Sequence, residues 1–226
     1  MAALKHSVPA VQIRLSGPER REQLIEVAID LFSRKGFKGT TTREIAAAAG
    51  VTEAIIFRHF ATKEHLYTAI IDYKLTSPQT AQWVAGLTLA MQNNDDEAVI
   101  RGLIGAIVAT SKLDPKFERL MLYAALEGNE TALLHMQQVT ASIADVFRSY
   151  ITRRQKQGRI SRHSPEAVLM AIVGMARQWA LGKYVHEFKD KKHLSEEQAI
   201  ESFTQIAMHG ICLAQPPKPR PLRSKR

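Results

Sequence analysis

Groups that can bind phosphate oxygens and base edges are concentrated between Thr40 and Lys63, in the segment TTTREIAAAAGVTEAIIFRHFATK. Hydroxyl, guanidinium and ammonium groups of this kind form many of the contacts between proteins and nucleic acids. Thr41 is followed at capping-box spacing by Glu44, and Thr52 is a good N-cap, so both threonines are predicted to begin helices. The segment therefore predicts two short helices with polar groups at their beginnings.

The two predicted helices are joined by a tight turn at Gly50, since glycine ends a helix in the left-handed conformation without a Cβ clash. Four apolar side chains can meet inside the angle between the helices: Ala46, Val51, Ile56 and Phe60. This is the layout of a helix-turn-helix, whose second helix enters the major groove of DNA. An ordinary helical hairpin would share the caps and the glycine. DNA binding is favoured because the outer face of the second helix is poor in Glu and Lys.

Two further helices frame this motif. Pro18 to Lys35 carries an apolar stripe and ends at Gly36, which indicates an amphipathic helix that braces the motif. Thr62 can cap a fourth helix that begins at Lys63, and a helix N-terminus with a lysine is a natural phosphate site. The fourth helix would connect the small domain to the rest of the chain, so movement of its far end would tilt the motif.

Length and composition indicate a protein with a substantial core. The chain has 226 residues, of which 45% are hydrophobic, and it contains one cysteine, Cys212. A single cysteine excludes an internal disulfide framework and gives no zinc-ligand spacing. Apolar runs such as 167–176 are too short to cross a bilayer, and Lys5 and Arg14 interrupt any signal-peptide pattern. These features predict a cytoplasmic protein without membrane contact.

The net charge of +9 is concentrated near the C-terminus. Residues 1–75 carry +3, residues 76–215 carry +1 and residues 216–226 carry +5. We favour a solvated, disordered end for the tail PPKPRPLRSKR, although it could add non-specific attraction to phosphates. The arm at residues 1–17 is also expected to be loose, although basic arms can lie in a minor groove.

From Ser77 onward the chain shows helical periodicity and no clear strand alternation. Further helices are expected at 79–92, 96–111, 115–127, 130–157, 165–187 and 195–213. The predicted organisation is a flexible arm at 1–17, a helix-turn-helix domain at 18–75, a larger helical domain at 76–214 and a basic tail at 215–226.

Small or apolar residues near one face of each of the last two helices suggest a self-complementary dimer surface. These residues are Ala171, Gly174, Ile200, Phe203, Ala207 and Gly210. The alternative is that both faces are used in the chain's own core. We favour the dimer.

The segment from about Arg20 to Tyr67 resembles the tetracycline-repressor (TetR) family of bacterial transcription regulators. The resemblance is carried by the long pattern LIEVAIDLFSRKGFKGTTTREIAAAAGVTEAIIFRHFATKEHLY. It implies an all-α fold, in which an N-terminal three-helix helix-turn-helix domain binds DNA and a larger helical domain binds a ligand and forms the dimer. The remaining two-thirds of the chain carries no motif that adds to the resemblance.

Ten positions match those at which the family contacts DNA: Thr41, Thr42, Arg43, Thr52, Glu53, Ala54, Ile55, Phe57, His59 and Lys63. The resemblance implies phosphate contacts for the first two threonines and a base contact for Arg43. It places the next four residues at the groove-facing start of the recognition helix. It implies backbone contacts for Phe57 and His59 and a phosphate contact for Lys63.

Two of these positions depart from the family pattern. Phe57 stands where the family usually has tyrosine, so a hydrogen bond to phosphate worth about 1 kcal/mol is lost. Ile55 stands where small or hydroxylated residues are common, and we expect it to contact a thymine methyl group. Glu53 could accept from a cytosine amino group, or it could only complement the helix dipole.

The resulting hypothesis is a homodimeric repressor that a small, largely apolar effector releases from a palindromic double-stranded DNA operator. Seven residues are candidates for the effector pocket: Phe117, Met121, Leu122, Phe147, Met170, Gln178 and Trp179. Methionine and aromatic side chains adapt to varied apolar ligands, and Gln178 or Arg177 could anchor a polar group. Plain core packing is the simpler interpretation of any one apolar residue in this set.

An enzyme is the competing class of function. The eight histidines form no metal-spaced pair with a carboxylate partner, and the sequence has no Gly-rich phosphate loop or nucleophile elbow. We therefore predict no catalytic residue, no metal and no cofactor. A DNA-binding protein that answers to a protein partner instead of a small ligand is a third hypothesis, which the sequence does not separate from the first.

Overall fold

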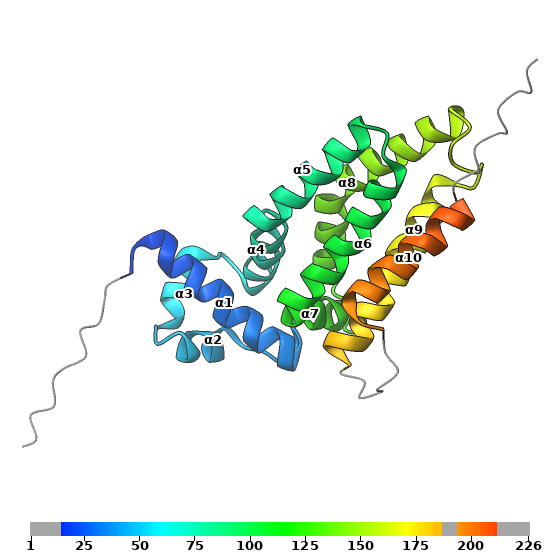
Figure 1. The fold of residues 1–226 in the computed structure, drawn as a ribbon. Helices are drawn as coiled ribbons and strands as arrows, with labels where there is room; N and C mark the ends of the chain where they lie inside the picture. Colours follow the sequence, from blue (N-terminus) through cyan, green and yellow to red (C-terminus); the bar gives the residue numbers. More distant parts are fainter. Residues whose placement is uncertain (1–14, 187–193, 212–226) are drawn as a thin grey trace, which may run out of the picture.

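The computed structural model describes residues 15–186 and 194–211, and every element within these ranges is helical (Figure 1). The elements are α1 (Gly17–Lys35), α2 (Thr42–Ala48), α3 (Glu53–His59), α4 (Lys63–Leu75), α5 (Pro78–Gln92), α6 (Asp96–Leu113), α7 (Pro115–Leu126), α8 (Glu130–Lys156), α9 (Pro165–Ala180), the π-helix η1 (Leu181–Val185) and α10 (Glu196–Ile211). The all-α prediction is confirmed. The predictions for Cys212, for the tail and for most of the N-terminal arm lie outside the described residues.

Side-chain caps and glycines set the helix boundaries. Ser16 begins α1, because its hydroxyl accepts from the Glu19 N–H at 3.4 Å while the Glu19 carboxylate accepts from the Ser16 N–H at 2.8 Å. Gly36 ends α1 with a φ of 72°, a value that favours glycine. Ser77 caps α5, and Pro78 at its first position separates it from α4.

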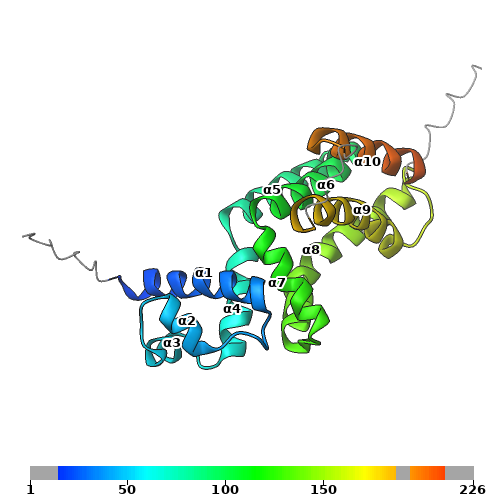
Figure 2. The ribbon, with the colours of Figure 1, turned by 90° about the horizontal axis from the view of Figure 1, so that it is seen from below.

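The described residues form two hydrophobic cores. The first lies under α1–α4 and also includes Leu120 and Met121 of α7 and Ala132 of α8. The second joins α5, α6, α8, α9 and α10 around the fully buried Ile104 and Ile172. The core of the N-terminal helices is therefore completed by α7, which lies between them and the rest of the molecule (Figure 2).

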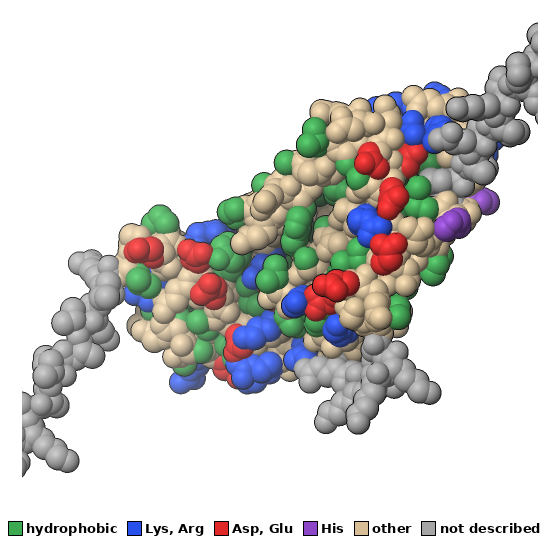
Figure 3. Space-filling view, in the orientation of Figure 1, with side chains coloured by type: hydrophobic (Ala, Val, Ile, Leu, Met, Phe, Trp, Pro, Cys, Tyr) green, Lys and Arg blue, Asp and Glu red, His purple; other side chains and the backbone are tan. Residues whose placement is uncertain are grey.

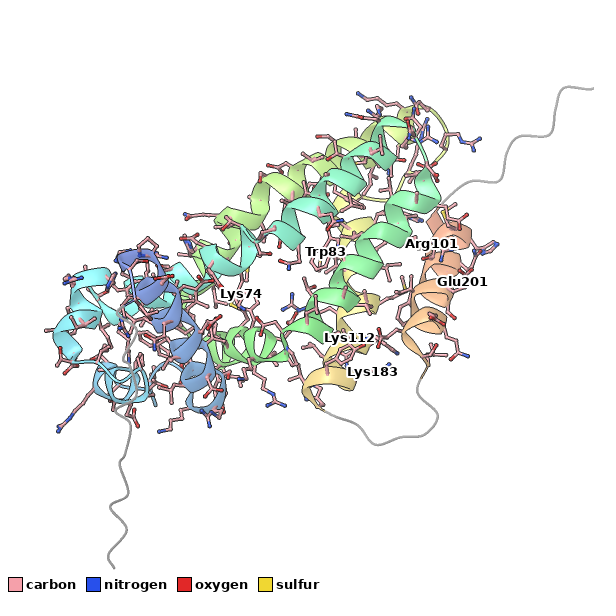
Figure 4. All side chains as sticks on the ribbon, turned by 60° about the vertical axis from the view of Figure 1, so that its left-hand side comes forward. Lys74, Trp83, Arg101, Lys112, Lys183 and Glu201 are labelled. Carbon is pink, nitrogen blue, oxygen red and sulfur yellow. The ribbon has the colours of Figure 1, made fainter. Side chains whose placement is uncertain are left out.

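Ion pairs connect the last helix to α6, which also packs against α5 and α9, and acidic and basic side chains lie next to one another on this side of the molecule (Figure 3). Arg101 of α6 pairs with Glu201 of α10 at 2.8 Å, and Lys112 of α6 pairs with Glu196 at 3.0 Å (Figure 4). One side of α10 is therefore committed to its own chain.

The helix predicted at 165–187 widens near its end. α9 stops at Ala180 and continues as η1, where the His186 N–H donates to the Leu181 carbonyl at 2.9 Å. Tyr184 packs edge-on against Trp179 in the preceding turn, with ring centroids 6.0 Å apart. A π-turn of this kind is often found at functional positions.

None of the described helices combines the length and the apolar character that crossing a bilayer requires. In the same part of the chain, no three His, Cys, Asp or Glu side chains are grouped as ligands of a metal ion.

Candidate nucleic-acid interface

The beginning of α2 is fixed by the predicted capping box. The Thr41 hydroxyl accepts from the Glu44 N–H at 3.2 Å, and the Glu44 carboxylate accepts from the Thr41 N–H at 2.9 Å. Lys35, at the end of α1, pairs with the same carboxylate at 2.7 Å. The Lys35 ammonium and then the Thr41 N–H lower the pKa of Glu44 to about 2. The carboxylate is therefore charged at neutral pH and joins the start of α2 to the end of α1.

The turn between α2 and α3 has the predicted conformation. Gly50 has a φ of 67°, and the Val51 N–H donates to the Ala46 carbonyl at 2.9 Å. From α1, the Gln23 side chain donates to the Ala49 carbonyl at 3.4 Å. The apolar residues predicted to meet inside the motif lie in or against the first core: Ala46, Val51, Ile56 and Phe60. The angle between the two helices is thus fixed from both sides.

The outer face of α3 combines apolar and hydrogen-bonding groups. Thr52, Ala54, Phe57 and Arg58 are exposed, and Phe57 has 48% of its surface in solvent. The Thr52 side chain forms no capping hydrogen bond with α3, so its hydroxyl is available to another partner. Ile55 is half-buried at the edge of this face. The face can therefore offer both apolar contact and hydrogen bonds to a groove of DNA.

An open groove of about 390 Å³ lies beside α3 and is lined by Thr41, Thr42, Phe57, Ala61, Thr62 and Lys63. The 13-residue helix α4 begins at this groove, and the Thr62 hydroxyl accepts from the His65 N–H at 3.1 Å. The remaining free N–H groups of a helix start, together with the helix dipole, favour an anion. Hydroxyl, N–H and ammonium groups thus converge on a space that can hold a phosphate.

Lys63 lines the groove, but its ammonium is also bound within the protein. Its Nζ donates to the Phe37 carbonyl at 2.8 Å and to the Thr40 carbonyl at 2.9 Å, and lies 4.0 Å from the centre of the Phe37 ring. An ammonium has three N–H donors, so one remains for a phosphate oxygen. The predicted phosphate lysine therefore also holds the turn between α1 and α2.

Three predicted DNA-contact residues have polar atoms that face the protein. The Glu53 carboxylate accepts from the Thr42 hydroxyl, which ties α3 to α2. The Nε2 atom of His59 is buried without a partner among the described residues. Burial, and then the charges of Arg58 and Arg21, lower the pKa of this imidazole. Thr42 and Glu53 are thus bonded to each other, whereas His59 has an imidazole nitrogen without a partner, and the DNA contacts of all three residues stay predictions.

Three residues of the interface are missing from the predicted set. Ala61 and Thr62 line the groove, and Arg58 is exposed on α3 next to Phe57. Thr62 could have been found from the sequence, because it precedes α4 as Thr41 precedes α2. Arg58 could also have been found from the sequence, because it is a cation on the outer face of the recognition helix.

The seven predicted ligand-binding residues do not meet in one cavity. Phe117 and Met121 pack with the first core, whereas Phe147 belongs to the second. Phe147 lines an enclosed cavity of about 10 Å³, which has room for about one water molecule. The structure therefore does not group these residues around one cavity, because helical periodicity marks apolar positions on faces that point to different cores, and their ligand contacts stay a prediction.

The other four candidates also lie apart from that cavity. Met170 has 74% of its surface exposed and Gln178 is exposed on the same helix, so neither lines an interior pocket. Leu122 is half-buried on α7. Trp179 packs against Tyr184, and Lys183 Nζ lies 4.7 Å from the centre of its indole.

The predicted dimer residues divide into two groups. Ala171, Gly174 and Gly210 are exposed. Ala207 is buried in the second core, and Ile200 and Phe203 pack against that core. Ala207 is therefore unavailable to a partner subunit in this structure, whereas Ile200 and Phe203 are only partly covered and stay predicted interface residues.

Two sequence models of one family match the chain. The model described as "Bacterial regulatory proteins, tetR family" matches residues 24–70, which include α2, α3 and the groove. The model described as "Tetracyclin repressor-like, C-terminal domain" matches residues 100–206, from α6 into α10.

Characterised regulators are similar over most of this length. The HTH-type transcriptional regulator RutR of Escherichia coli O157:H7 is 26% identical over 205 residues, which is 85% of this chain and 90% of RutR. The HTH-type transcriptional activator FasR of Mycolicibacterium smegmatis is 22% identical over 203 residues, which is 88% of this chain and 85% of FasR.

Solved structures share the fold. The fatty acid degradation regulator FadR from Bacillus halodurans superposes with a TM-score of 0.68 at 16% identity, over 87% of this chain and 98% of FadR. AibR, solved with isovaleryl coenzyme A and operator DNA, superposes with a TM-score of 0.62 at 21% identity, over 83% of this chain and 97% of AibR. At these identities the likeness concerns the fold alone.

Proposed function

The chain belongs to the TetR family of DNA-binding transcription regulators, and from this premise we propose that it is a homodimeric repressor. Each subunit places α3 in the major groove at one half of a palindromic operator. A small, largely apolar effector bound in the helical domain releases the dimer from DNA.

One observation carries the DNA-binding assignment: the exposed face of α3 adjoins a groove with the chemistry of a phosphate site. Arg43 is exposed near the start of α2, and we assign it a base contact. The exposed Phe57 ring packs against a deoxyribose of the DNA backbone, and this contact is favourable because it removes apolar surface from water. The Thr62 hydroxyl and the remaining Lys63 donor bind phosphate. The Thr41 hydroxyl, which donates to the Glu44 carboxylate at 3.1 Å in this structure, joins them by turning to the phosphate.

We place the dimer contact on the exposed side of α9. Ala167, Met170, Ala171 and Gly174 follow the spacing of one helix face, and all four are exposed. The neighbouring α10 adds Ile206, which has 58% of its surface in solvent. Small residues let a partner helix approach closely, and the exposed methionine and isoleucine supply apolar area.

The dimer must match the geometry of the operator. Two recognition helices related by a two-fold axis fit successive major grooves when their half-sites lie about 34–36 Å apart, or a multiple of that distance. A palindromic footprint follows from this symmetry.

The effector would act through the helices that surround α7. α5 leaves room for such a site. Met91 is the one buried residue among its 15 positions, so most of the helix surface is not covered by other helices. Trp83 of α5 and Lys74 of α4 lie on the side of these helices that faces α6 and α7 (Figure 4). An effector that shifts the dimer from mostly bound to mostly free needs a differential affinity of roughly 5 kcal/mol for the two states.

A second candidate is a repressor that answers to a protein partner. The cavity beside Phe147 favours it in one respect, because about 10 Å³ does not admit an effector at that place and leaves only the space beside α5 for one. The two candidates differ in a thermal-shift screen with small apolar compounds. A compound that raises the melting temperature and weakens operator binding supports the effector, since binding to one state stabilises that state.

Selection of bound fragments from the source genome tests the proposal. We expect enrichment of a short palindromic sequence, whose footprint covers two half-sites. Anisotropy titrations at increasing salt should then show much tighter binding to this sequence than to a random duplex. Equal affinity for both duplexes at physiological salt would refute sequence-specific regulation.

A further inference from the structure

The end of α7 is hydrogen-bonded to the turn that precedes α2, about 90 residues away in the sequence. The Glu127 carboxylate accepts from the Phe37 N–H at 2.8 Å and from the Lys38 N–H at 3.2 Å. The Lys38 ammonium returns the contact by donating to the Glu127 carbonyl at 2.9 Å. These bonds connect the larger helical domain to residues 36–40 directly, without passing through α4.

Gly36 shows how closely the carboxylate is seated. A Cβ atom at this position would lie 2.2 Å from Glu127 Oε1 and 3.0 Å from the Tyr123 ring. The Tyr123 hydroxyl donates to the Arg34 carbonyl at 3.2 Å, in the last turn of α1. Tyr123 thus satisfies a carbonyl that the end of α1 leaves free, and Glu127, directly after α7, binds N–H groups of the turn that follows α1.

The opposite side of the same turn is held by the groove lysine. Lys63 Nζ binds the carbonyls of Phe37 and Thr40, and Thr40 directly precedes the capping Thr41. The Phe37 ring also packs edge-on against Tyr67 of α4, and the Tyr67 hydroxyl donates to the Leu120 carbonyl of α7 at 2.8 Å. A shift of Glu127 therefore moves the backbone that positions both Lys63 and the start of α2.

We propose that Glu127 is a positioning residue for the phosphate groove. A conformational change in α7 would alter DNA binding through the hydrogen bonds between Glu127 and residues 36–40. This inference rests on the proposed operator binding. Glu127 itself does not line the groove. It acts through the turn at residues 36–40, whose backbone positions the Lys63 ammonium and Thr41 for contact with a phosphate.

A double-mutant cycle on operator affinity tests this route. Glu127→Gln keeps the side-chain size but replaces one acceptor oxygen with an NH₂ group, and we expect it to weaken operator binding about tenfold. In a Lys63→Ala background the same change should weaken binding less than about twofold, because the ammonium that the turn positions is gone. In an Arg58→Ala background it should keep its full effect, since Arg58 is on α3.

The matched control is Glu130→Gln, which removes a charge from an exposed residue at the start of α8 and should leave operator affinity unchanged. Unchanged affinity in Glu127→Gln would overturn the inference, as would an equal loss in the Lys63→Ala and Arg58→Ala backgrounds. A lower melting temperature with unchanged affinity would show that Glu127 only stabilises the fold.

Hydrogen exchange on the wild-type protein needs neither a variant nor DNA. The Phe37 and Lys38 amides should exchange at least about tenfold more slowly than in an unstructured peptide, because both are bonded to the carboxylate. Exchange at the rate of an unstructured peptide would show that the Glu127 carboxylate does not hold these two amides, and would overturn the inference. If the wild-type protein bound no operator, the proposed function would fail together with this inference, whereas the outcomes above refute the Glu127 route alone.

Discussion

At the scale of single residues, Arg43 is the side chain whose loss should change sequence preference. It is exposed at the second position of α2. Arg43→Ala should cost about 1–3 kcal/mol of specific binding and relax the preference at one base pair. Competition titrations with operators that vary one base pair at a time measure both effects. Arg34→Ala is the control, because Arg34 is exposed at the end of α1 and pairs with Asp30; an unchanged profile for Arg43→Ala would remove its base role.

Glu44 should give the helix-turn-helix an acid-sensitive step. Its folded-state pKa of about 2 lies below the ordinary value of 4.5, so its stabilising effect is complete above pH 4.5 and is lost as the pH falls towards 2. Glu44→Gln should therefore be less stable than wild type at pH 7, and the difference should shrink below pH 4.5. Urea unfolding at a series of pH values measures this, with the exposed Glu26→Gln as control. A difference independent of pH would contradict the assignment.

At the scale of elements, the turn between α2 and α3 requires a left-handed backbone at Gly50. Its φ is 67°, and a Cβ atom there would meet nothing within 4 Å. Gly50→Ala should therefore cost about 1–2 kcal/mol through backbone strain without a steric clash. Gly158 has a φ of 68° and equally open space after α8, so Gly158→Ala should cost the same stability.

The pair of glycines separates stability from DNA reading. Gly50→Ala should also weaken operator binding, because strain in the turn changes the angle at which α3 is held, whereas Gly158→Ala should not. Denaturant unfolding and operator titrations on the two variants give the comparison. Equal operator affinities would show that α3 is oriented by its core contacts and not by the turn.

These elements also show which parts of the molecule can be read from the sequence. Capping residues and glycines act on their near neighbours, so Thr41, Gly50 and Thr62 predicted the limits of the motif helices correctly. Helical periodicity finds apolar faces but not what covers them. For that reason the sequence predicts a dimer surface at Ala207, which is buried, and a pocket at Met170, which is exposed.

Contacts across long sequence separations were out of reach for a different reason. Glu127 has no local pattern that relates it to Phe37, and only the packing of α7 against α1 brings them together. The same packing explains why the first core does not stop at the predicted domain boundary of residue 75. Leu120 and Ala124 of α7 are fully buried with the N-terminal helices.

At the scale of the whole molecule, the shared first core limits how the parts can move. α7 packs against α1, and His135 of α8 lies 2.8 Å from Asp72 of α4. Lys74 of α4 pairs with Asp114 at the start of α7 at 2.5 Å. The DNA-binding helices are thus attached at several points to the helices that would surround an effector. A change in α7 is therefore expected to move the DNA-binding helices of a subunit together, in addition to the local shift of residues 36–40.

The distance between the DNA-binding helices of the two subunits depends on the dimer contact, which we place on the exposed side of α9. Met170→Glu should leave the folded monomer almost as stable as wild type, because 74% of Met170 is already in solvent. In the dimer the same change would bury a charge against apolar residues, which costs several kcal/mol. Sedimentation velocity should show a shift from dimer to monomer, with a large loss of operator affinity, since one recognition helix then binds without the other. Leu89→Glu is the control, because Leu89 is 60% exposed on α5, away from α9. A dimer that persists in Met170→Glu, and also in Ile206→Glu, would place the interface on another surface.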